Sequence, residues 1–176
     1  NSRFVRLLSR VSVNIIKKKF MNSLEKESLF LKDQIGKEVG SSKWVTIDQK
    51  RINEFATITE DHQFIHIDPE RAKQLSPYDK TIAHGFLILS FASKFAMDVL
   101  PEASLKAVRI NYGFNKVRFL HPVYVGASIR GTFSLNRLEK KEPNSLLQVF
   151  ELTIEIRDTK KPALVSEWLI LTQYNE

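Results

Sequence analysis

The chain has 176 residues, of which 43% are hydrophobic and 27% charged, and this composition suits one globular domain, alone or with an appendage. It has no cysteine, which excludes disulfides, a thiol nucleophile and cysteine-ligated metal, and it fits the reducing cytoplasm, where we expect the protein to act. No apolar run reaches the length of about 18 residues that a transmembrane helix needs. The formal net charge of +7 favours anionic partners.

The first 19 residues carry most of this charge, because they contain six basic residues and no acidic one. Apolar residues recur between the basic ones at helical spacing, which predicts a helix over 3–34. Three interpretations remain open: weak membrane association through residues 1–31, an arm packed on the domain or on a partner subunit, and a fragment of a signal or linker. No basic patch with interleaved aromatic residues is present, so we expect no nucleic-acid binding.

A break separates this N-terminal segment from the rest of the chain. Glycine and serine are concentrated over 36–42, and such residues punctuate regular structure. We therefore divide the chain into an amphipathic basic helical segment, 1–35, and one domain, 36–176. Residues 43–47 are a candidate for a short strand.

Helices dominate the first part of this domain. Asp48 is a suitable N-cap for a helix over 49–59, and Asp68-Pro69 starts another short helix. Residues 82–99 form the longest apolar stretch and are apolar nearly all round. That pattern predicts a helix that is buried on most sides.

The hydrophobic period changes to two after residue 105, as is typical of long antiparallel strands. Proline-containing turns separate the four strands, which are expected over 106–119, 123–138, 145–158 and 163–174. One apolar helix followed by a run of long strands predicts an α+β fold, in which a long antiparallel sheet is wrapped around a central apolar helix.

The first candidate site is the pair Asp61 and His66, which lie five residues apart between two predicted helices. One can be ionised and the other neutral near pH 7, as acid/base chemistry requires. His62 and His66 also stand one residue from a zinc protease motif, but Gln63 replaces the glutamate that this motif needs. We therefore expect no metal and expect His62 to cap a turn.

The second candidate site is His84-Gly85, at the start of the apolar helix. The exposed N–H groups of a first helical turn stabilise developing negative charge, so this segment has the outline of an oxyanion hole. A tight turn capped by His84 is the alternative. Further along the chain, Lys116 and Arg118 are either solvated strand side chains or phosphate contacts.

Together these segments resemble the MaoC-like hydratases, the (R)-specific enoyl-CoA hydratase family, and within it the NodN-like subgroup. The family motif has an Asp and a His five residues apart, then Asp-Pro, then a His-Gly that opens the central helix. The resemblance covers about 36–174 and leaves out the N-terminal helix. The matching residues here are Asp61, His66, Asp68, Pro69, His84 and Gly85, followed by the similar stretch Asn111–Phe119 and by Glu167-Trp168.

The resemblance implies a hot-dog fold, to which the N-terminal helix predicted from its helical spacing is an addition, and it implies a homodimer. It also implies that Asp61 and His66 hold one water, which adds to a trans-2-enoyl thioester to give an (R)-3-hydroxyacyl thioester. Which of the two is the acid and which the base is left open. The substrate would be a thioester of CoA or of acyl carrier protein, with no further cofactor.

Supporting roles follow from the same resemblance. The N–H of Gly85, with His84 beside it, would hold the thioester oxygen, and Ser93 would orient His66. Lys116 or Arg118 would meet the CoA phosphates.

Two alternatives remain open. A hot-dog acyl-CoA thioesterase would attack the thioester carbonyl with a carboxylate and water, and would not need His66. A non-catalytic module that binds acyl-CoA or lipid would need neither Asp61 nor His66, so the presence of both speaks against it.

Overall fold

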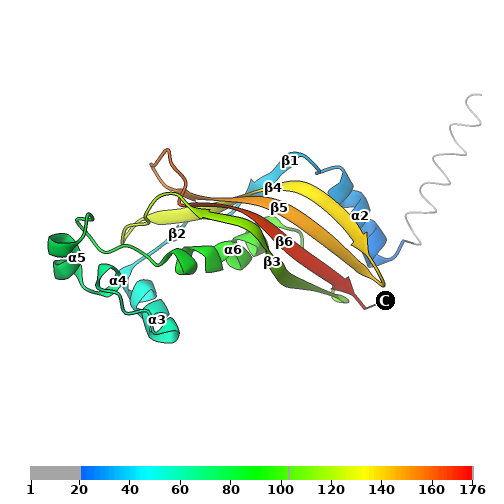
Figure 1. The fold of residues 1–176 in the computed structure, drawn as a ribbon. Helices are drawn as coiled ribbons and strands as arrows, with labels where there is room; N and C mark the ends of the chain where they lie inside the picture. Colours follow the sequence, from blue (N-terminus) through cyan, green and yellow to red (C-terminus); the bar gives the residue numbers. More distant parts are fainter. Residues whose placement is uncertain (1–20, 103, 176) are drawn as a thin grey trace, which may run out of the picture.

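The computed structural model describes residues 21–102 and 104–175, in which one curved antiparallel sheet holds a helix in its concave face (Figure 1). The strands follow the order β1-β4-β5-β6-β3, and the short β2 also pairs with β4. No helix in the described residues is long and apolar enough to cross a membrane. The strands are β1 (Lys37–Ser41), β2 (Val45–Thr46), β3 (Ala107–Phe119), β4 (Ser128–Lys141), β5 (Ser145–Ile156) and β6 (Leu164–Tyr174).

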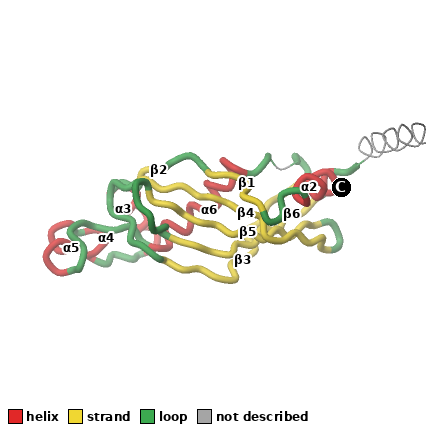
Figure 2. The backbone as a smooth tube through the Cα atoms, turned by 90° about the horizontal axis from the view of Figure 1, so that it is seen from above, coloured by secondary structure: helices red, strands yellow, loops and turns green. Residues whose placement is uncertain are grey.

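The helices differ in length and in place. The central helix is the longest of those described and runs along the sheet, with three helices gathered at one of its ends and one at the other (Figures 1 and 2). These are α6 (Gly85–Val99) in the centre, α3 (Gln49–Thr59), α4 (Phe64–Ile67) and α5 (Pro69–Leu75) at one end, and α2 (Ser23–Lys32) at the other.

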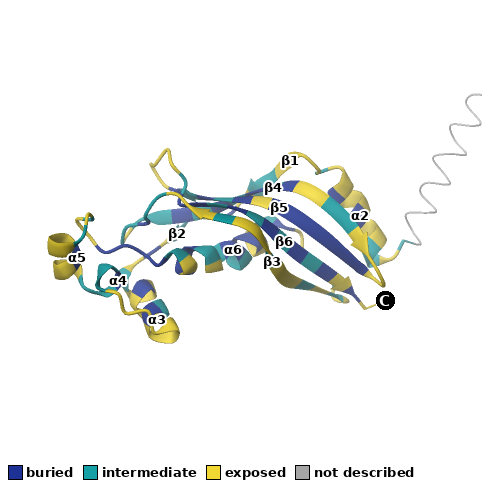
Figure 3. Ribbon diagram, viewed as in Figure 1, coloured by how far each residue is buried: buried dark blue, intermediate teal, exposed yellow. Residues whose placement is uncertain are grey.

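The core lies between α6 and the concave face of the sheet. Phe95 of α6 and Trp168, Phe133 and Phe150 of the strands are at most 1% exposed, and the central strand β5 is buried along most of its length (Figure 3). Burial of one such side chain contributes roughly 1.5–3 kcal/mol before its conformational entropy is counted. This core explains why residues 82–99 are apolar nearly all round.

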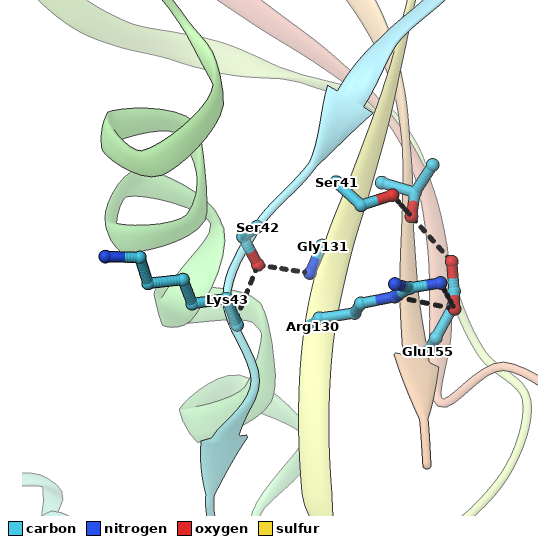
Figure 4. Close-up of polar contacts among 7 residues, drawn as sticks. Ser41, Ser42, Lys43, Arg130, Gly131 and Glu155 are labelled. Carbon is cyan, nitrogen blue, oxygen red and sulfur yellow. Dashed lines mark hydrogen bonds and ion pairs between the residues drawn. The ribbon is translucent and has the colours of Figure 1, made fainter. Parts of the chain in front are cut away.

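A glycine lets α6 approach β4. A Cβ on Gly131 would lie 2.8 Å from Cδ2 of Phe95, so any side chain there would push the helix away from the strand. The N–H of Gly131 donates to the Ser42 hydroxyl at 3.0 Å, and that hydroxyl donates to the carbonyl of Lys43 (Figure 4). The chain after β1 is thereby held against β4.

The predicted elements are largely confirmed. The helix that begins after Asp48 is α3, and Asp48 accepts from the N–H of Arg51 at 2.9 Å as an N-cap does. The sheet around one apolar helix is also as expected. The four long strands are present, but β4 begins at Ser128 and not at residue 123, because residues 125–126 form a turn in which Gly126 has φ of 85°.

The expected break at 36–42 is wrong in part, because residues 37–41 form the edge strand β1. The N-terminal helix is observed as α2, which begins after a capping box between Asn22 and Glu25 and buries Leu31 in the core. The part of the predicted helix that falls in 1–20 lies outside the described residues.

Candidate active site

The loop between α3 and α4 carries Asp61. Helix α3 ends at Thr59. Its C-cap Glu60 has φ of 60°, which turns the chain sharply, and Asp61 follows with an exposed side chain. The next turn, α4, places His66 one helical turn further on, where it is 7% exposed. The spacing of five residues thus puts an exposed carboxylate and a buried imidazole on one side of a tight loop.

His66 is fixed by a backbone carbonyl. Its Nδ1 lies 2.7 Å from the oxygen of Ile82, and since a carbonyl only accepts, Nδ1 must carry the proton. Burial, aided by the nearby His84, lowers the pKa of His66 below its ordinary value, although the Ile82 carbonyl and Asp61 oppose that change. His66 is therefore neutral near pH 7 and has a free lone pair on Nε2, as a general base needs.

His84 connects the two halves of the site. It is 2% exposed, its ring stacks on that of His66 with centroids 3.8 Å apart, and Phe55 closes its other side at 5.1 Å. Its Nε2 donates to the backbone oxygen of Asp61 at 3.0 Å. The residue before α6 therefore holds the loop that bears the carboxylate.

Side-chain atoms of Asp61, His66 and His84 all lie within 4.8 Å of one another. A water that accepts or donates two hydrogen bonds of about 2.8 Å can bridge groups at such distances. A metal ion fits less well, because metal bonds lie in the plane of an imidazole at about 2.0–2.1 Å, whereas these two rings are stacked with an interplanar angle of 27°. Lone pairs that lie in two nearly parallel, separated planes do not both point at one ion.

Gly85 opens α6 beside this trio. The first N–H groups of a helix have no partner within it, and Gly85 lines a cavity of about 260 Å³ together with Tyr78, Phe119 and His121. We call it the Gly85 cavity. A Cβ on Gly85 would lie 3.0 Å from ring atoms of Phe119, so the glycine allows the ring and the helix start to lie close together.

No hydrogen bond joins Ser93 to His66 in the part of the chain that the structure describes. It lies eight residues beyond Gly85, which is about 12 Å along the helix axis, and the Asn111 amide donates to its hydroxyl at 3.0 Å. The group that orients His66 is the carbonyl of Ile82. A backbone acceptor leaves no signal in the sequence, so this partner was missed.

Ser93 instead lines a second cavity, of about 250 Å³, between the C-terminal half of α6 and the strands β3 and β6. We call it the α6 cavity. Its walls are mostly apolar. They consist of Ser93, Ala96, Met97 and Leu100 from α6, Arg109, Ile110 and Asn111 from β3, and Trp168 and Ile170 from β6.

Lys116 and Arg118 are exposed on β3, the strand that ends at Phe119 beside Gly85. The guanidinium of Arg118 donates to the adjacent carbonyl of Val117 at 2.9 Å. Both cations therefore lie on the edge strand that leads to the Gly85 cavity, and neither is near the Asp61 loop in the chain.

Comparison with known proteins agrees with this geometry. The family model described as "MaoC like domain" matches residues 31–153. The chain belongs to the MaoC-like domain family. Within this family, Nodulation protein N of Rhizobium meliloti is 43% identical over 141 residues, which cover 80% of this chain and 88% of that protein. The 3-hydroxyacyl-thioester dehydratase Z of Mycobacterium tuberculosis is 42% identical over 135 residues, covering 77% and 88%.

Solved structures with this MaoC-like fold confirm the hot-dog architecture. The monoamine oxidase regulatory protein from Archaeoglobus superimposes with a TM-score of 0.70 at 25% identity, covering 81% of this chain and 92% of that one. The (R)-hydratase from A. caviae involved in PHA biosynthesis gives a TM-score of 0.61 at 20% identity, covering 80% and 98%. The relatives of this chain therefore include a protein named as a 3-hydroxyacyl-thioester dehydratase, and its fold is shared with an (R)-hydratase.

Proposed function

We propose that this protein is an (R)-specific enoyl thioester hydratase, which also catalyses the reverse dehydration of a 3-hydroxyacyl thioester. The observation that carries the proposal is the meeting of the Asp61 carboxylate with His66, whose Nε2 is free and whose pKa is lowered by burial. A pure binding module gains nothing from burying an imidazole whose one nitrogen is fixed and whose other is left open.

The acid/base roles follow from the state of His66. The neutral imidazole accepts a proton from a bound water as the water oxygen bonds to C3 of the enoyl thioester. The Asp61 carboxylate accepts a hydrogen bond from the second hydrogen of the same water. The C2–C3 electrons move toward the thioester, whose oxygen becomes enolate-like. The imidazolium then returns its proton to C2, so one water has been added and His66 is neutral again.

The N-terminus of α6 stabilises the enolate. The N–H of Gly85 points out of the first helical turn, and the helix dipole adds partial positive charge there. The Gly85 cavity provides room for the thioester next to this donor. The acyl chain then runs along the apolar side of α6 toward the α6 cavity, which has mostly apolar walls.

We further propose that two copies pair through β3 and that the thioester is carried by CoA. Strand β3 is an edge of the sheet, and it leaves apolar side chains open: Val108 is 62% and Tyr112 61% exposed. Joining two such edges would complete a sheet across the dimer. Lys116 and Arg118 on the same strand would supply cations for CoA phosphates.

The test follows crotonyl-CoA hydration by the loss of absorbance of the conjugated thioester. We expect the wild type to hydrate it and the product to be oxidised by an (R)-specific, not an (S)-specific, 3-hydroxyacyl-CoA dehydrogenase. Asp61→Asn should slow the reaction about 10²- to 10⁴-fold. His62→Gln is the matched control, because His62 is exposed in the same loop and has no role in the mechanism.

Three outcomes would contradict the proposal. Failure of the wild type to hydrate both short and long enoyl-CoA would exclude the hydratase. Release of free thiol from saturated acyl-CoA would indicate the thioesterase. Full activity of Asp61→Asn would place the chemistry elsewhere.

A further inference from the structure

Most of helix α2 lies outside the region that the family model matches, yet α2 contacts a residue that lines the α6 cavity. The family match begins at residue 31, and α2 spans Ser23–Lys32. Its Glu27 forms an ion pair with Arg109 at 3.1 Å, and Arg109 lines the cavity. The side chains of both are largely buried, at 15% and 21% exposed.

Several contacts hold Glu27 in this place. The hydroxyl of Tyr174 donates to one carboxylate oxygen at 2.5 Å, and the amide of Gln148 donates to the other at 3.3 Å. These two residues lie on β6 and β5, so the carboxylate spans three neighbouring strands through Arg109 on β3. A carboxylate with partners on three strands is held in one position, and it holds Arg109, which lines the cavity.

The position of this wall follows from the sheet register. Arg109 is paired with Thr172 and Asn111 with Ile170 on β6, so Arg109 lies further from the Gly85 end than Asn111 does. Helix α2 also meets the chain that leaves α6, where the hydroxyls of Ser23 and Ser104 are 3.0 Å apart. The cavity therefore runs from Ser93 toward a charged end beneath α2.

We propose that α2 closes the far end of the α6 cavity through Glu27 and Arg109, and thereby sets the longest acyl chain that the protein accepts. This inference rests on the proposed function, because it takes the α6 cavity as the place of the acyl chain. An acyl chain whose terminal methyl group reaches Arg109 meets a largely buried ion pair. A longer chain would bury no further apolar surface unless that ion pair were broken.

A binding assay tests this without chemistry. Trp168 lines the cavity, so its fluorescence should report binding of saturated acyl-CoA of increasing chain length. The full chain is used with Trp44→Phe, which removes a tryptophan that contacts Arg130 and Arg157 and not the cavity. Affinity should rise about fourfold for each added methylene that is buried, and stop rising where the chain reaches Arg109.

The opening variant is Glu27→Ala combined with Arg109→Ala, which removes both charges and leaves none unpaired. We expect affinity to keep rising for about two further methylenes, again about fourfold each. The matched control is Lys26→Ala with Lys106→Ala. Lys26 is the exposed neighbour of Glu27 on α2, and Lys106 is exposed just before β3, three residues from Arg109. In this control, affinity should stop rising at the same acyl-chain length as in the wild type. Ala96→Leu, which narrows the cavity from α6, should shorten the limit.

The two proposals fail in different ways. An unchanged limit in the opening variant, or no limit in the wild type, overturns the role of α2 even if crotonyl-CoA is hydrated. A limit that moves as expected while no enoyl-CoA is hydrated supports the role of α2 and overturns the hydratase. If the opening variant does not fold, an unchanged limit in Ala96→Leu overturns the inference, because the acyl chain then lies elsewhere.

Discussion

The two ends of α6 are built in different ways. At its N-terminal end, loops bring titratable side chains together, and backbone carbonyls of Ile82 and Asp61 hold the two imidazoles. Toward its C-terminal end, strand side chains such as Trp168 and Ile170 form an apolar cavity. The geometry of the N-terminal end depends on the path of the backbone, whereas the shape of the C-terminal end depends on which side chains face inward. Substitutions should therefore affect chemistry at one end and packing or chain length at the other.

The largest effect is expected from breaking the acid/base pair. His66→Gln should reduce the rate of crotonyl-CoA hydration about 10²- to 10⁴-fold, because glutamine cannot accept the proton. Adding Asp61→Asn to it should cost little more, since the two residues act on one water. Steady-state rates of the two single variants and the double variant measure this. Losses that multiply in full would mean that the two act independently.

Gly131 tests the packing of the C-terminal half of α6 against β4. Its substitution by alanine should destabilise the fold by about 1–3 kcal/mol, because the new methyl group meets the fully buried ring of Phe95. The free energy of unfolding in urea measures this. Combining Gly131→Ala with Phe95→Leu should cost less than the sum of the two single changes. A Gly131→Ala variant as stable as wild type would show that the helix can move off β4.

The corresponding test at the other end is Gly85→Ala. Its methyl group would also meet a ring, but Phe119 is 48% exposed and can turn away, so stability should change by less than about 1 kcal/mol. Hydration should nevertheless slow about tenfold, because the thioester is displaced from the N–H donor. Unfolding and kinetics are measured on the same preparation. A loss of stability that matches the one at Gly131 would remove the distinction between the two ends.

The smallest expected effect is the dependence of stability on pH. The pKa of His66 in the folded protein is lowered from 6.5, so the unfolded chain binds the proton more readily. Stability should be full above pH 6.5 and fall as the pH drops below it toward the folded-state pKa, by at most about 1.4 kcal/mol per pH unit. His66→Gln should reduce this slope, whereas His62→Gln should not. Equal slopes in all three proteins would contradict the burial of a neutral His66.

The hydratase rate should follow the same group. Because the base must be neutral, the rate should fall as the pH is lowered through the folded-state pKa of His66, which lies below 6.5.

Most of the fold could be predicted because its signals are local. Asp48 as an N-cap, Pro69 in a first helical turn and the alternation in the long strands all report directly on backbone conformation. The short edge strand β1 could not be predicted, because five residues that include Gly40 show too little alternation of apolar and polar side chains. Its pairing with β4 depends on residues almost a hundred positions away.

The sequence indicated the side chains of the candidate site but not the main-chain hydrogen bonds that hold them in place. Side-chain atoms of Asp61 and His66 lie close together, and His84, which contacts both residues, immediately precedes Gly85 at the start of α6. The contact of Ser93 with His66 that the resemblance implied is not observed, because Ser93 lies two helical turns beyond Gly85, where its hydroxyl accepts from Asn111. The Ile82 carbonyl and the bond from His84 to the Asp61 backbone are contacts to main-chain atoms, which every residue possesses and no sequence pattern marks.

His84 donates a hydrogen bond to the main chain of Asp61 and so ties the loop after α3 to the start of α6. His84 is covalently joined to Gly85, so the loop that bears the carboxylate and the helix end that bears the N–H donor are coupled by a single imidazole. Thermal motion that shifts the loop should carry the helix terminus with it. In a bound substrate, covalent bonds fix the distance between the attacked carbon and the thioester oxygen. The coupling through His84 keeps the distance between the Asp61 carboxylate and the Gly85 N–H similarly constant.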